Sequence, residues 1–336
     1  MADASSAGLP AADAVVLTAL PEERDAFLAV LDGVQPVRRN GVDLHTARLG
    51  GLLVAVDSLH GMGNPGAAVT AGALLARWRS PHVLLVGIAG GVGAAGVRIG
   101  DVVVPDQVVG YEPAKVRPDG PQRRPEAYRP DFDLLTVAQS VQAEEWVPRI
   151  RAERPAPDDP AVHFGTVLSG EKVIADAALL AELRAEWPRT VGVEMESFGV
   201  ALAAYRFGGR FLMVKGASDL ADAAKDDRWR AYAAEAAARF AVAVLHRLPA
   251  ADPGRLPDLH VPGPVMVQVC RRLVHDWPEL ARYFEIPEHT RAAFRQGDEP
   301  ARVWEWLASR RRLRELPAAL VALGREDLAE ELLHVA

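Results

Sequence analysis

Acidic residues stand at the ends of three segments that the sequence predicts to be buried strands. They are Glu22 and Glu23 after "AVVLTAL", Glu194 and Glu196 in "VGVEMES", and Asp219 at the end of "VKGASD". Carboxylates that meet at the carboxyl edge of an open α/β sheet can serve as general acids and bases or bind hydroxyl groups. Taken singly, such residues are also typical of solvated loops, helix N-termini and N-caps. The pattern therefore indicates a site only if the three strand ends converge.

Other chemical motifs are weaker. A literal G-x-G-x-x-G stands at Gly91, Gly93 and Gly96, but a dinucleotide fingerprint needs a helix there, and the strand-like "VRIGDVVVP" follows instead. A tight turn between strands, which still lets a ligand approach the backbone, is the better interpretation. The nine histidines show neither H-x-x-x-H nor H-E-x-x-H spacing, and Cys270 is the only cysteine, so we expect no metal site. G-x-S-x-G is absent from the sequence.

The bulk composition bounds the class of protein. A chain of 336 residues with 49% hydrophobic and 25% charged residues is ordinary for a globular protein of two domains. A net charge of −7 argues against a general nucleic-acid partner. One cysteine fits a reducing compartment, and neither a signal peptide nor an apolar run of membrane-spanning length is recognisable. The sequence predicts a soluble, cytoplasmic protein without a membrane partner.

Two folded regions follow from the hydrophobic pattern. Residues 1–12 read as a disordered tail, and in residues 13–247 β-rich apolar runs alternate with Ala/Leu-rich helical stretches. That alternation predicts a three-layer α/β domain. Residues 248–263 are dense in Pro and Gly and read as a linker. Residues 264–336 lose the strand pattern and predict a small all-α domain of six amphipathic helices.

The first region resembles the nucleoside phosphorylase superfamily and, within it, the methylthioadenosine/S-adenosylhomocysteine nucleosidases. The matching pieces occur in family order over roughly residues 14–247: "TALPEERDAF", "SLHGMGNPGAAV", "VGIAGGVGAAGVRIGDVVVPDQVV", "GTVLSGEKVIAD", "VGVEMESFGVALAA" and "VKGASDLAD". The resemblance implies an α/β sandwich of the nucleoside phosphorylase type. It further implies a homo-oligomer, a dimer or larger, that acts on a purine nucleoside without metal or organic cofactor.

The resemblance also implies roles for individual residues. Asp219 matches the acid that protonates the departing base at N7, and Glu23 matches the carboxylate that activates the attacking water. Glu196 matches the residue that binds the ribose hydroxyls, whereas Glu194 has no matching role and reads as structural. Further substrate contacts are implied for Met195, Gly90, Ile88, Val173 and Ser218.

Hydrolysis and phosphorolysis differ in the charge they require. A phosphorylase needs positive charge for phosphate, and in that branch an arginine stands two residues before the Gly-rich turn, where this chain has Leu85. Glu23 in the first loop would repel phosphate and activate water. The sequence therefore favours a purine N-glycosyl hydrolase over a phosphorylase.

Two departures from the family pattern concern the substrate. An aromatic residue stacks on adenine in the methylthioadenosine enzymes, whereas Val173 occupies that position here. The region expected at the ribose 5′ end offers the basic residues Lys172, Lys225, Arg228 and Arg230. These are either solvated helix charges or, if two or more point inward, ligands for a 5′-phosphate or triphosphate. The alternative substrate is then a nucleotide such as AMP or ATP.

The helical region resembles death-fold, or bacterial effector-associated, adaptor domains. The resemblance rests on the helix count, the tryptophan before "ELA", the "WEWL" helix and the closing "LGREDLAEEL". It implies a death-fold partner protein for residues 264–336. Two alternatives to a salvage nucleosidase follow: a recruited antiphage or conflict effector that depletes AMP or ATP, and a non-catalytic nucleoside-sensing module with a death-fold adaptor.

Overall fold

The computed structural model describes residues 12–39, 42–59, 61–76, 78, 80–118, 120–221, 228–248, 261–310 and 312–335. Contacts between Cα atoms divide the chain into two compact units, one of residues 9–255 and one that contains residues 256–336. The predicted tail (1–12) and linker (248–263) lie largely outside the described residues.

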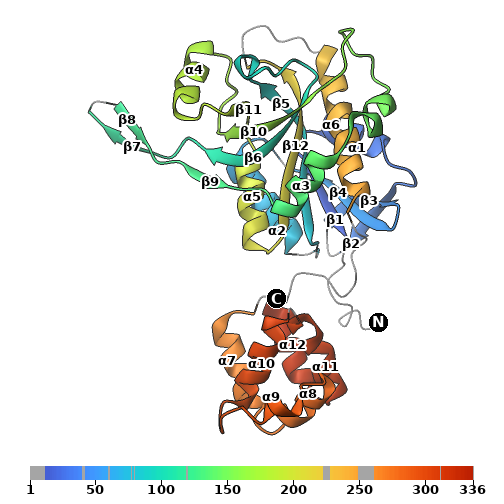
Figure 1. Cartoon of the computed structure of the whole chain (residues 1–336), viewed down its shortest axis with the longest axis vertical. Coiled ribbons are helices and arrows are strands. Elements are labelled where there is room, and N and C mark those ends of the chain that lie inside the picture. The colour runs from blue at the N-terminus through green and yellow to red at the C-terminus, as the bar shows by residue number, and fades with distance from the viewer. Residues whose placement is uncertain are drawn as a thin grey trace. The chain divides into compact units, whose positions relative to one another are not determined.

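A mixed ten-stranded sheet forms the centre of the first unit (Figure 1). A short strand, β9 (Glu126–Tyr128), pairs only on β6 within that sheet. The other strands lie in the order β11 (Thr190–Glu194), β10 (Val162–Ser169), β6 (Val102–Gly110), β12 (Arg210–Asp219), β5 (His82–Gly91), β1 (Ala14–Thr18), β4 (Leu52–Ser58), β3 (Val42–Leu49) and β2 (Gln35–Arg39).

One end of the sheet closes on itself. Besides its parallel partner β10, β11 pairs antiparallel with β5, so that β11, β10, β6, β12 and β5 form a ring of five strands. In this ring Val193 of β11 and Asp219 of β12 are both registered against Gly90 of β5. The ring therefore brings together the ends of strands that are far apart in the sequence.

Helices cover both faces of the sheet, as its alternating side chains require. Leu84 and Val86 of β5 pack with Phe27 in the core beneath α1 (Pro21–Ala29), α3 (Phe132–Ser140) and α6 (Arg228–His246). Val83 and Leu85 pack on the opposite face, beneath α2 (Asn64–Leu75) and α5 (Ser197–Arg206). A smaller cluster includes Leu183 of α4 (Ala177–Glu186). The prediction of a three-layer α/β fold is confirmed.

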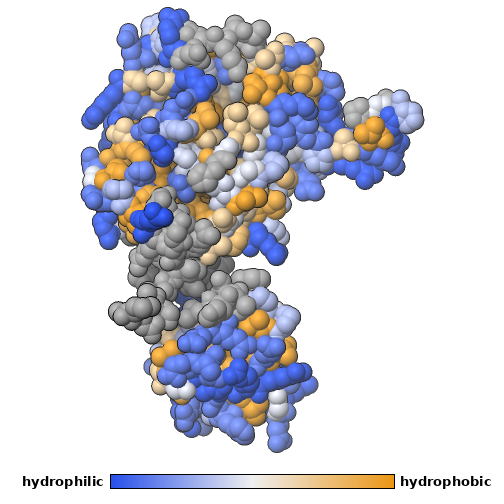
Figure 2. Space-filling model, turned by 180° about the vertical axis from the view of Figure 1, so that it is seen from behind, coloured by the Kyte–Doolittle hydropathy of each residue, from blue (hydrophilic) through white to orange (hydrophobic). Residues whose placement is uncertain are grey.

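Residues 112–160 contain strands and short turns in addition to the helix α3. A two-stranded ribbon, β7 (Ala114–Arg117) and β8 (Gly120–Arg123), extends from the unit, and Figure 2 shows it as a mostly hydrophilic arm. Arg123 anchors it to α4 through Glu182 and Glu186 at 2.7 and 2.5 Å. The described part of the unit also contains the 3-10 turns η1 (Gly93–Ala95), η2 (Ala143–Glu145) and η3 (Val147–Arg149). Because η1 leads into β6, the Gly-rich stretch is a turn between strands, as predicted.

The second unit is all helical, which confirms the predicted class of this region. Its described helices are α7 (Gly263–Arg272), α8 (Trp277–Tyr283), α9 (Glu288–Arg291), α10 (Glu299–Ser309), η4 (Leu313–Glu315), α11 (Leu316–Ala322) and α12 (Glu326–Val335). Their apolar faces form one core that includes Val269, Leu273, Leu307, Leu320 and Leu332. Within the described part of both units, no helix combines the length and the apolar character that a membrane span needs.

Candidate active site

One pocket gathers most of the residues that the sequence singles out. It lies where β5, β11 and β12 end, and its lining includes Glu23, Ile88, Gly90, Lys172, Val173, Met195, Glu196, Ser218, Asp219 and Arg230. Arg228, the first residue of α6, does not contribute to this lining. Lys225 falls outside the described residues. The structure therefore brings all three acidic strand ends to one place.

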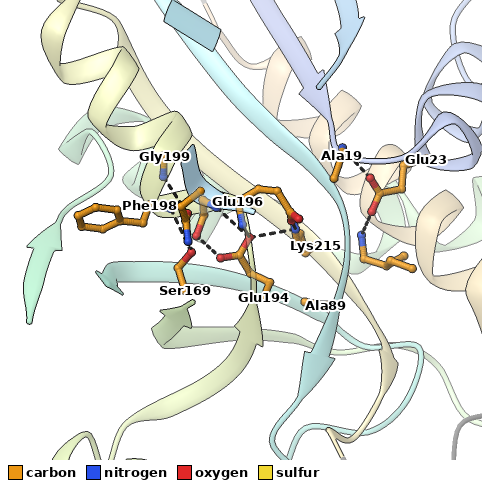
Figure 3. Close-up of polar contacts among 12 residues, drawn as sticks. Ala19, Glu23, Ala89, Ser169, Glu194, Glu196, Phe198, Gly199 and Lys215 are labelled. Atoms are coloured by element: carbon orange, nitrogen blue, oxygen red, sulfur yellow. Dashed lines mark hydrogen bonds and ion pairs between the residues drawn. The ribbon is translucent and has the colours of Figure 1, made fainter. Parts of the chain in front are cut away.

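Glu23 is held in the first turn of α1 by backbone N–H groups. Its carboxylate accepts a hydrogen bond from Ala19 at 2.8 Å (Figure 3). It also accepts hydrogen bonds from Leu20 at 2.8 Å and from Ile88 at 2.7 Å. Burial raises the pKa of Glu23 above its ordinary value, although Lys215 and the N–H groups of Ile88 and Leu20 act in the opposite direction. A buried carboxylate with a raised pKa is a better proton acceptor near neutral pH than an exposed one.

A buried lysine that the sequence analysis did not single out holds the two glutamates of "VGVEMES". Lys215 Nζ lies 3.0 Å from Glu194 Oε2 and 2.8 Å from Glu196 Oε2, and Figure 3 shows the three side chains pointing toward one another. Burial alone would lower the pKa of Lys215, but the carboxylates of Glu196, Glu194 and Glu23 outweigh it, and the pKa is raised. The ammonium is therefore charged and compensates the acids around it.

The two glutamates have different surroundings. Glu194 accepts hydrogen bonds from the backbone N–H groups of Glu196 and Ser197 at 3.0 and 2.9 Å, and from the Ser197 hydroxyl at 2.6 Å. Despite burial, Lys215 and these donors lower the pKa of Glu194. The carboxylate of Glu194 is therefore engaged in capping the N-terminus of α5. Within the described part of the chain, Glu196 Oε1 has only a 3.5 Å contact with Gly63 N, which leaves it able to accept hydrogen bonds in the pocket.

Asp219 is oriented at the end of β12 by its neighbours. Its Oδ1 accepts a hydrogen bond from Ala221 N at 2.9 Å, and its Oδ2 lies 3.1 Å from the Ser218 hydroxyl. A Cβ at Gly90 would lie 3.1 Å from Asp219 Oδ1, so the glycine permits this close approach.

The basic residues at the mouth of the pocket are ion-paired. Lys172 Nζ lies 2.8 Å from Glu112 Oε2, and Arg230 pairs with Glu22. Val173 is 58% exposed, and the described lining contains no aromatic side chain. Among the described residues, no cluster of three His, Cys, Asp or Glu side chains has the arrangement that a metal ion needs. The pocket thus offers carboxylates, backbone and aliphatic contacts.

This geometry suits acid–base chemistry on a polyhydroxylated substrate. Glu23 and Asp219 are carboxyl groups on different strand ends of one pocket, and Glu196 lies between the lysine and the pocket interior. One carboxylate can take a proton from water, a protonated carboxyl group can give its proton to a leaving group, and a further carboxylate can accept hydrogen bonds from hydroxyl groups.

Comparisons with known proteins identify the family of each region. Residues 13–247 match the family model of the phosphorylase superfamily, and residues 263–335 match that of bacterial death-like domain 3. One similar solved structure is the methylthioadenosine/S-adenosylhomocysteine nucleosidase of Neisseria meningitidis in complex with methylthio-immucillin-A. It is 22% identical, its TM-score is 0.56, and the match covers 71% of this chain and 100% of that chain.

Two further structures share the fold. The S-adenosylhomocysteine nucleosidase of Streptococcus pyogenes in complex with 5-methylthiotubericidin is 22% identical over 73% of this chain and 100% of its own, with a TM-score of 0.58. The futalosine hydrolase of Helicobacter pylori is 19% identical over 71% and 99%, with a TM-score of 0.56. Since the family model spans the whole ring-closed sheet and every residue of the pocket, the chain belongs to the phosphorylase superfamily.

Proposed function

We propose that the chain hydrolyses the N-glycosidic bond of a purine nucleoside. The observation that supports this most directly is the meeting of Glu23, Glu196 and Asp219 in one pocket. Bond cleavage develops positive charge on the sugar and negative charge on the base. A pocket with an acid for the base and carboxylates around the sugar stabilises both.

In the proposed reaction, Asp219 donates a proton to N7 of the base as the bond between C1′ and the base breaks. Water attacks C1′ and gives its proton to Glu23, so that the products are the free base and the free sugar. Glu196 accepts hydrogen bonds from the ribose hydroxyls through Oε1, while Lys215 keeps Oε2 in place at 2.8 Å. Proton transfer by positioned groups of this kind contributes about 10²–10⁴-fold in rate.

The charge of the site favours water over phosphate as the nucleophile. Among the described residues of the site, three buried carboxylates, Glu23, Glu194 and Glu196, surround a single buried ammonium, that of Lys215. A phosphate anion near Glu23 would be repelled by this excess of negative charge in a medium of low dielectric constant. We therefore propose hydrolysis rather than phosphorolysis.

The 5′ substituent of the substrate is proposed to be uncharged or zwitterionic, as in the thioether nucleosides. Lys172 and Arg230 are the two basic residues in the described lining, and each already pairs with a carboxylate, Glu112 or Glu22. A 5′-phosphorylated substrate such as AMP or ATP would have to displace those carboxylates. It remains the second candidate because both cations lie at the pocket.

The test is the release of free adenine from methylthioadenosine, adenosylhomocysteine, adenosine, AMP and ATP, each with and without inorganic phosphate. We expect release from the thioether nucleosides, at a rate that phosphate does not change. Release chiefly from AMP or ATP would show that the substrate is a nucleotide and not a thioether nucleoside. Strict dependence on phosphate would contradict hydrolysis, and no release from any of the five would contradict the enzyme.

Asp219→Asn provides the residue-level test. The amide cannot give up a proton to the base, so kcat should fall by about 10²-fold or more. Asp25→Asn, in an exposed pair with Arg24 on α1, serves as the matched control and should keep the wild-type rate. Unchanged base release by Asp219→Asn would remove the acid from the mechanism.

We further propose that the α/β unit forms homo-oligomers through the exposed face of α2 and α5. An apolar groove there is lined in part by Pro65, Ala68, Phe198 and Leu202. Val69 and Tyr205 on the same helices are 72% and 76% exposed. Exposed apolar side chains gathered on one face are typical of a protein interface.

Residues 263–335 are proposed to bind a death-fold partner protein, in line with the death-like family that they match. Such a partner would recruit or localise the nucleosidase unit. Binding of a candidate death-like protein should be lost when residues 261–336 are deleted, and retention of that binding would contradict the proposal.

A further inference from the structure

Asn64, the first residue of α2, has a buried side chain that uses its whole hydrogen-bonding capacity. Its Nδ2 donates to Gly170 O at 3.2 Å and to Glu171 Oε1 at 3.1 Å. Its Oδ1 accepts from the Ser169 hydroxyl at 3.0 Å and from Gly199 N at 2.9 Å. An amide has two N–H donors and two lone pairs, so all four are engaged, and a flipped amide would set donor against donor at Gly199.

These four bonds connect three segments that adjoin the proposed sugar site. Asn64 follows Met62 and Gly63, Gly199 belongs to the first turn of α5 after Glu196, and the 169–171 segment leads to Lys172. Met62, Lys172 and Glu196 all line the pocket, whereas Asn64 itself does not. Asn64 therefore lies behind the wall of the active-site pocket, at the apolar groove beside α2 and α5 that it helps to line, and it joins parts of that wall.

Two glycines lie in the closely packed backbone around Asn64. A Cβ at Gly199 would overlap the Asn64 carbonyl oxygen, and a Cβ at Gly63 would lie 2.6 Å from Glu171 Oε2. Gly63 also has a φ of 97°, which side chains other than glycine rarely adopt. Its N–H faces Glu196 Oε1 at 3.5 Å. The position of this N–H, and with it the free oxygen of Glu196, depends on where Asn64 holds the loop.

We propose that Asn64 is a positioning residue for the ribose hydroxyls. It fixes the distance between the Gly63 loop, the 169–171 segment and the α5 N-terminus, so that Glu196 Oε1 is presented at the place where the hydroxyls bind. This inference rests on the proposed function and deepens it, because it assigns part of the sugar recognition to a residue that touches no substrate.

The test compares Asn64→Asp with the wild type in the full-length protein. Aspartate keeps the shape and both accepted hydrogen bonds but sets a carboxylate against Glu171 and the Gly170 carbonyl. We expect KM for the best nucleoside to rise about tenfold or more, with a smaller change in kcat. The preference for that nucleoside over its 2′-deoxy analogue should shrink, since part of the benefit of the 2′-hydroxyl is lost.

Two further variants separate positioning from a general loss of stability. In the double variant that combines Asn64→Asp with Glu171→Gln, the new amide at position 171 donates to the new carboxylate at position 64. KM and the ribose preference should therefore return part of the way. Thr166→Val removes a buried hydroxyl that accepts a 2.9 Å bond from Gln107 outside the described pocket lining. This control should lower Tm without changing KM.

The outcomes distinguish this inference from the proposed function. If Asn64→Asp lowers Tm as Thr166→Val does and keeps both KM and the ribose preference, Asn64 is only structural. If the wild type releases no base, the hydrolase is wrong, and calorimetric binding of methylthioadenosine to wild type and Asn64→Asp takes the place of KM. An equal Kd for the two proteins, or no nucleoside binding by either, overturns the positioning role.

Discussion

Glu23 is both a buried residue and the proposed catalytic base. Two of its three N–H donors come from the loop before α1 and the third from β5, so the carboxylate is fixed between two elements. Such donors stabilise the charged form, yet burial dominates and the pKa is raised. The residue is thereby rigid and basic, as a group that must take a proton from water should be.

The raised pKa of Glu23 predicts the acid side of the pH profile. Because the base acts only when deprotonated, kcat/KM should fall as the pH drops through the pKa of Glu23, which lies above the ordinary 4.5 of a glutamic acid. The profile of base release against pH should therefore show an acid limb with its midpoint above 4.5. A limb at or below that value would show that Glu23 is not the group that titrates.

Gly87 controls the same carboxylate by its lack of a side chain. A Cβ at this position would overlap all three terminal atoms of Glu23, both oxygens and the carbon between them. Gly87→Ala should therefore displace the carboxylate and lower kcat by about tenfold or more. Gly66→Ala in α2, where a Cβ meets nothing within 4 Å, is the matched control and should keep the wild-type kcat. Equal kcat values for the wild type, Gly87→Ala and Gly66→Ala would show that catalysis does not depend on the position of the Glu23 carboxylate.

At the scale of elements, Lys215 joins β12 to the N-terminus of α5. Its ammonium bonds Glu194, which caps α5, and Glu196, which precedes that helix. Removing one partner of a buried ionic group leaves charge without compensation, which costs about 3–5 kcal/mol. Lys215→Met should therefore lower the free energy of unfolding by about that amount in urea titrations.

Arg239→Met is the control for this prediction. It breaks the pair between Arg239 and Glu235 within α6, whose side chains are 12% and 14% exposed against 1% for Lys215. The loss of stability should be clearly smaller. A Lys215→Met protein as stable as Arg239→Met would show that the two glutamates do not depend on the lysine.

The acidic strand ends could be predicted because a local sequence pattern, an apolar run followed by an acidic residue, marks each of them. Apolar runs that end in Glu23, Glu196 and Asp219 are visible in the sequence, and parallel strands bring such ends to one edge of a sheet. Lys215 was missed because it lies inside an apolar run, where lysine is rarely buried unless it is paired. Its place four residues before Asp219 in the same strand was the available signal, although a register shift between Ala217 and Asp219 breaks the simple alternation of faces.

The closed ring and the ribbon could not be predicted from local sequence patterns. Closure depends on the antiparallel pairing of β11 with β5, and these strands are separated by several other elements. Residues 114–123 of the ribbon include two prolines and two arginines, and all four residues of β7 are exposed, so the hydrophobic periodicity that marks a strand is missing. Asn64 was missed for a related reason, since its four partners come from distant segments.

At the scale of the whole molecule, each unit has its own core, and each exposes apolar side chains. Leu202 of α5 is 39% exposed at the apolar groove, and Val267 of α7 is 40% exposed on the helical unit. If α2 and α5 form the oligomer interface, Leu202→Asp should convert the oligomer to monomers, because a charge would be buried there without a partner. Light scattering coupled to size exclusion measures the mass directly.

Val267→Asp is the matched control, with the same change at nearly the same exposure. It should leave the oligomer intact. A wild-type protein that is monomeric at all concentrations would contradict the interface. If the oligomer is lost with Val267→Asp and kept with Leu202→Asp, the interface lies on the helical unit and not on α2 and α5.

The ring of five strands also determines when, during synthesis of the chain, the sheet and the pocket can form. β5 ends at Gly91, but two of its partners in the ring begin only at Thr190 and Arg210. Until those residues have left the ribosome, β5 has a bare edge, and the pocket lacks Glu196, Ser218 and Asp219. Such long-range pairing is typical of slow folding. A nascent or truncated chain therefore presents an apolar strand to its surroundings well before it has any site, and such an unpaired strand edge is prone to aggregation.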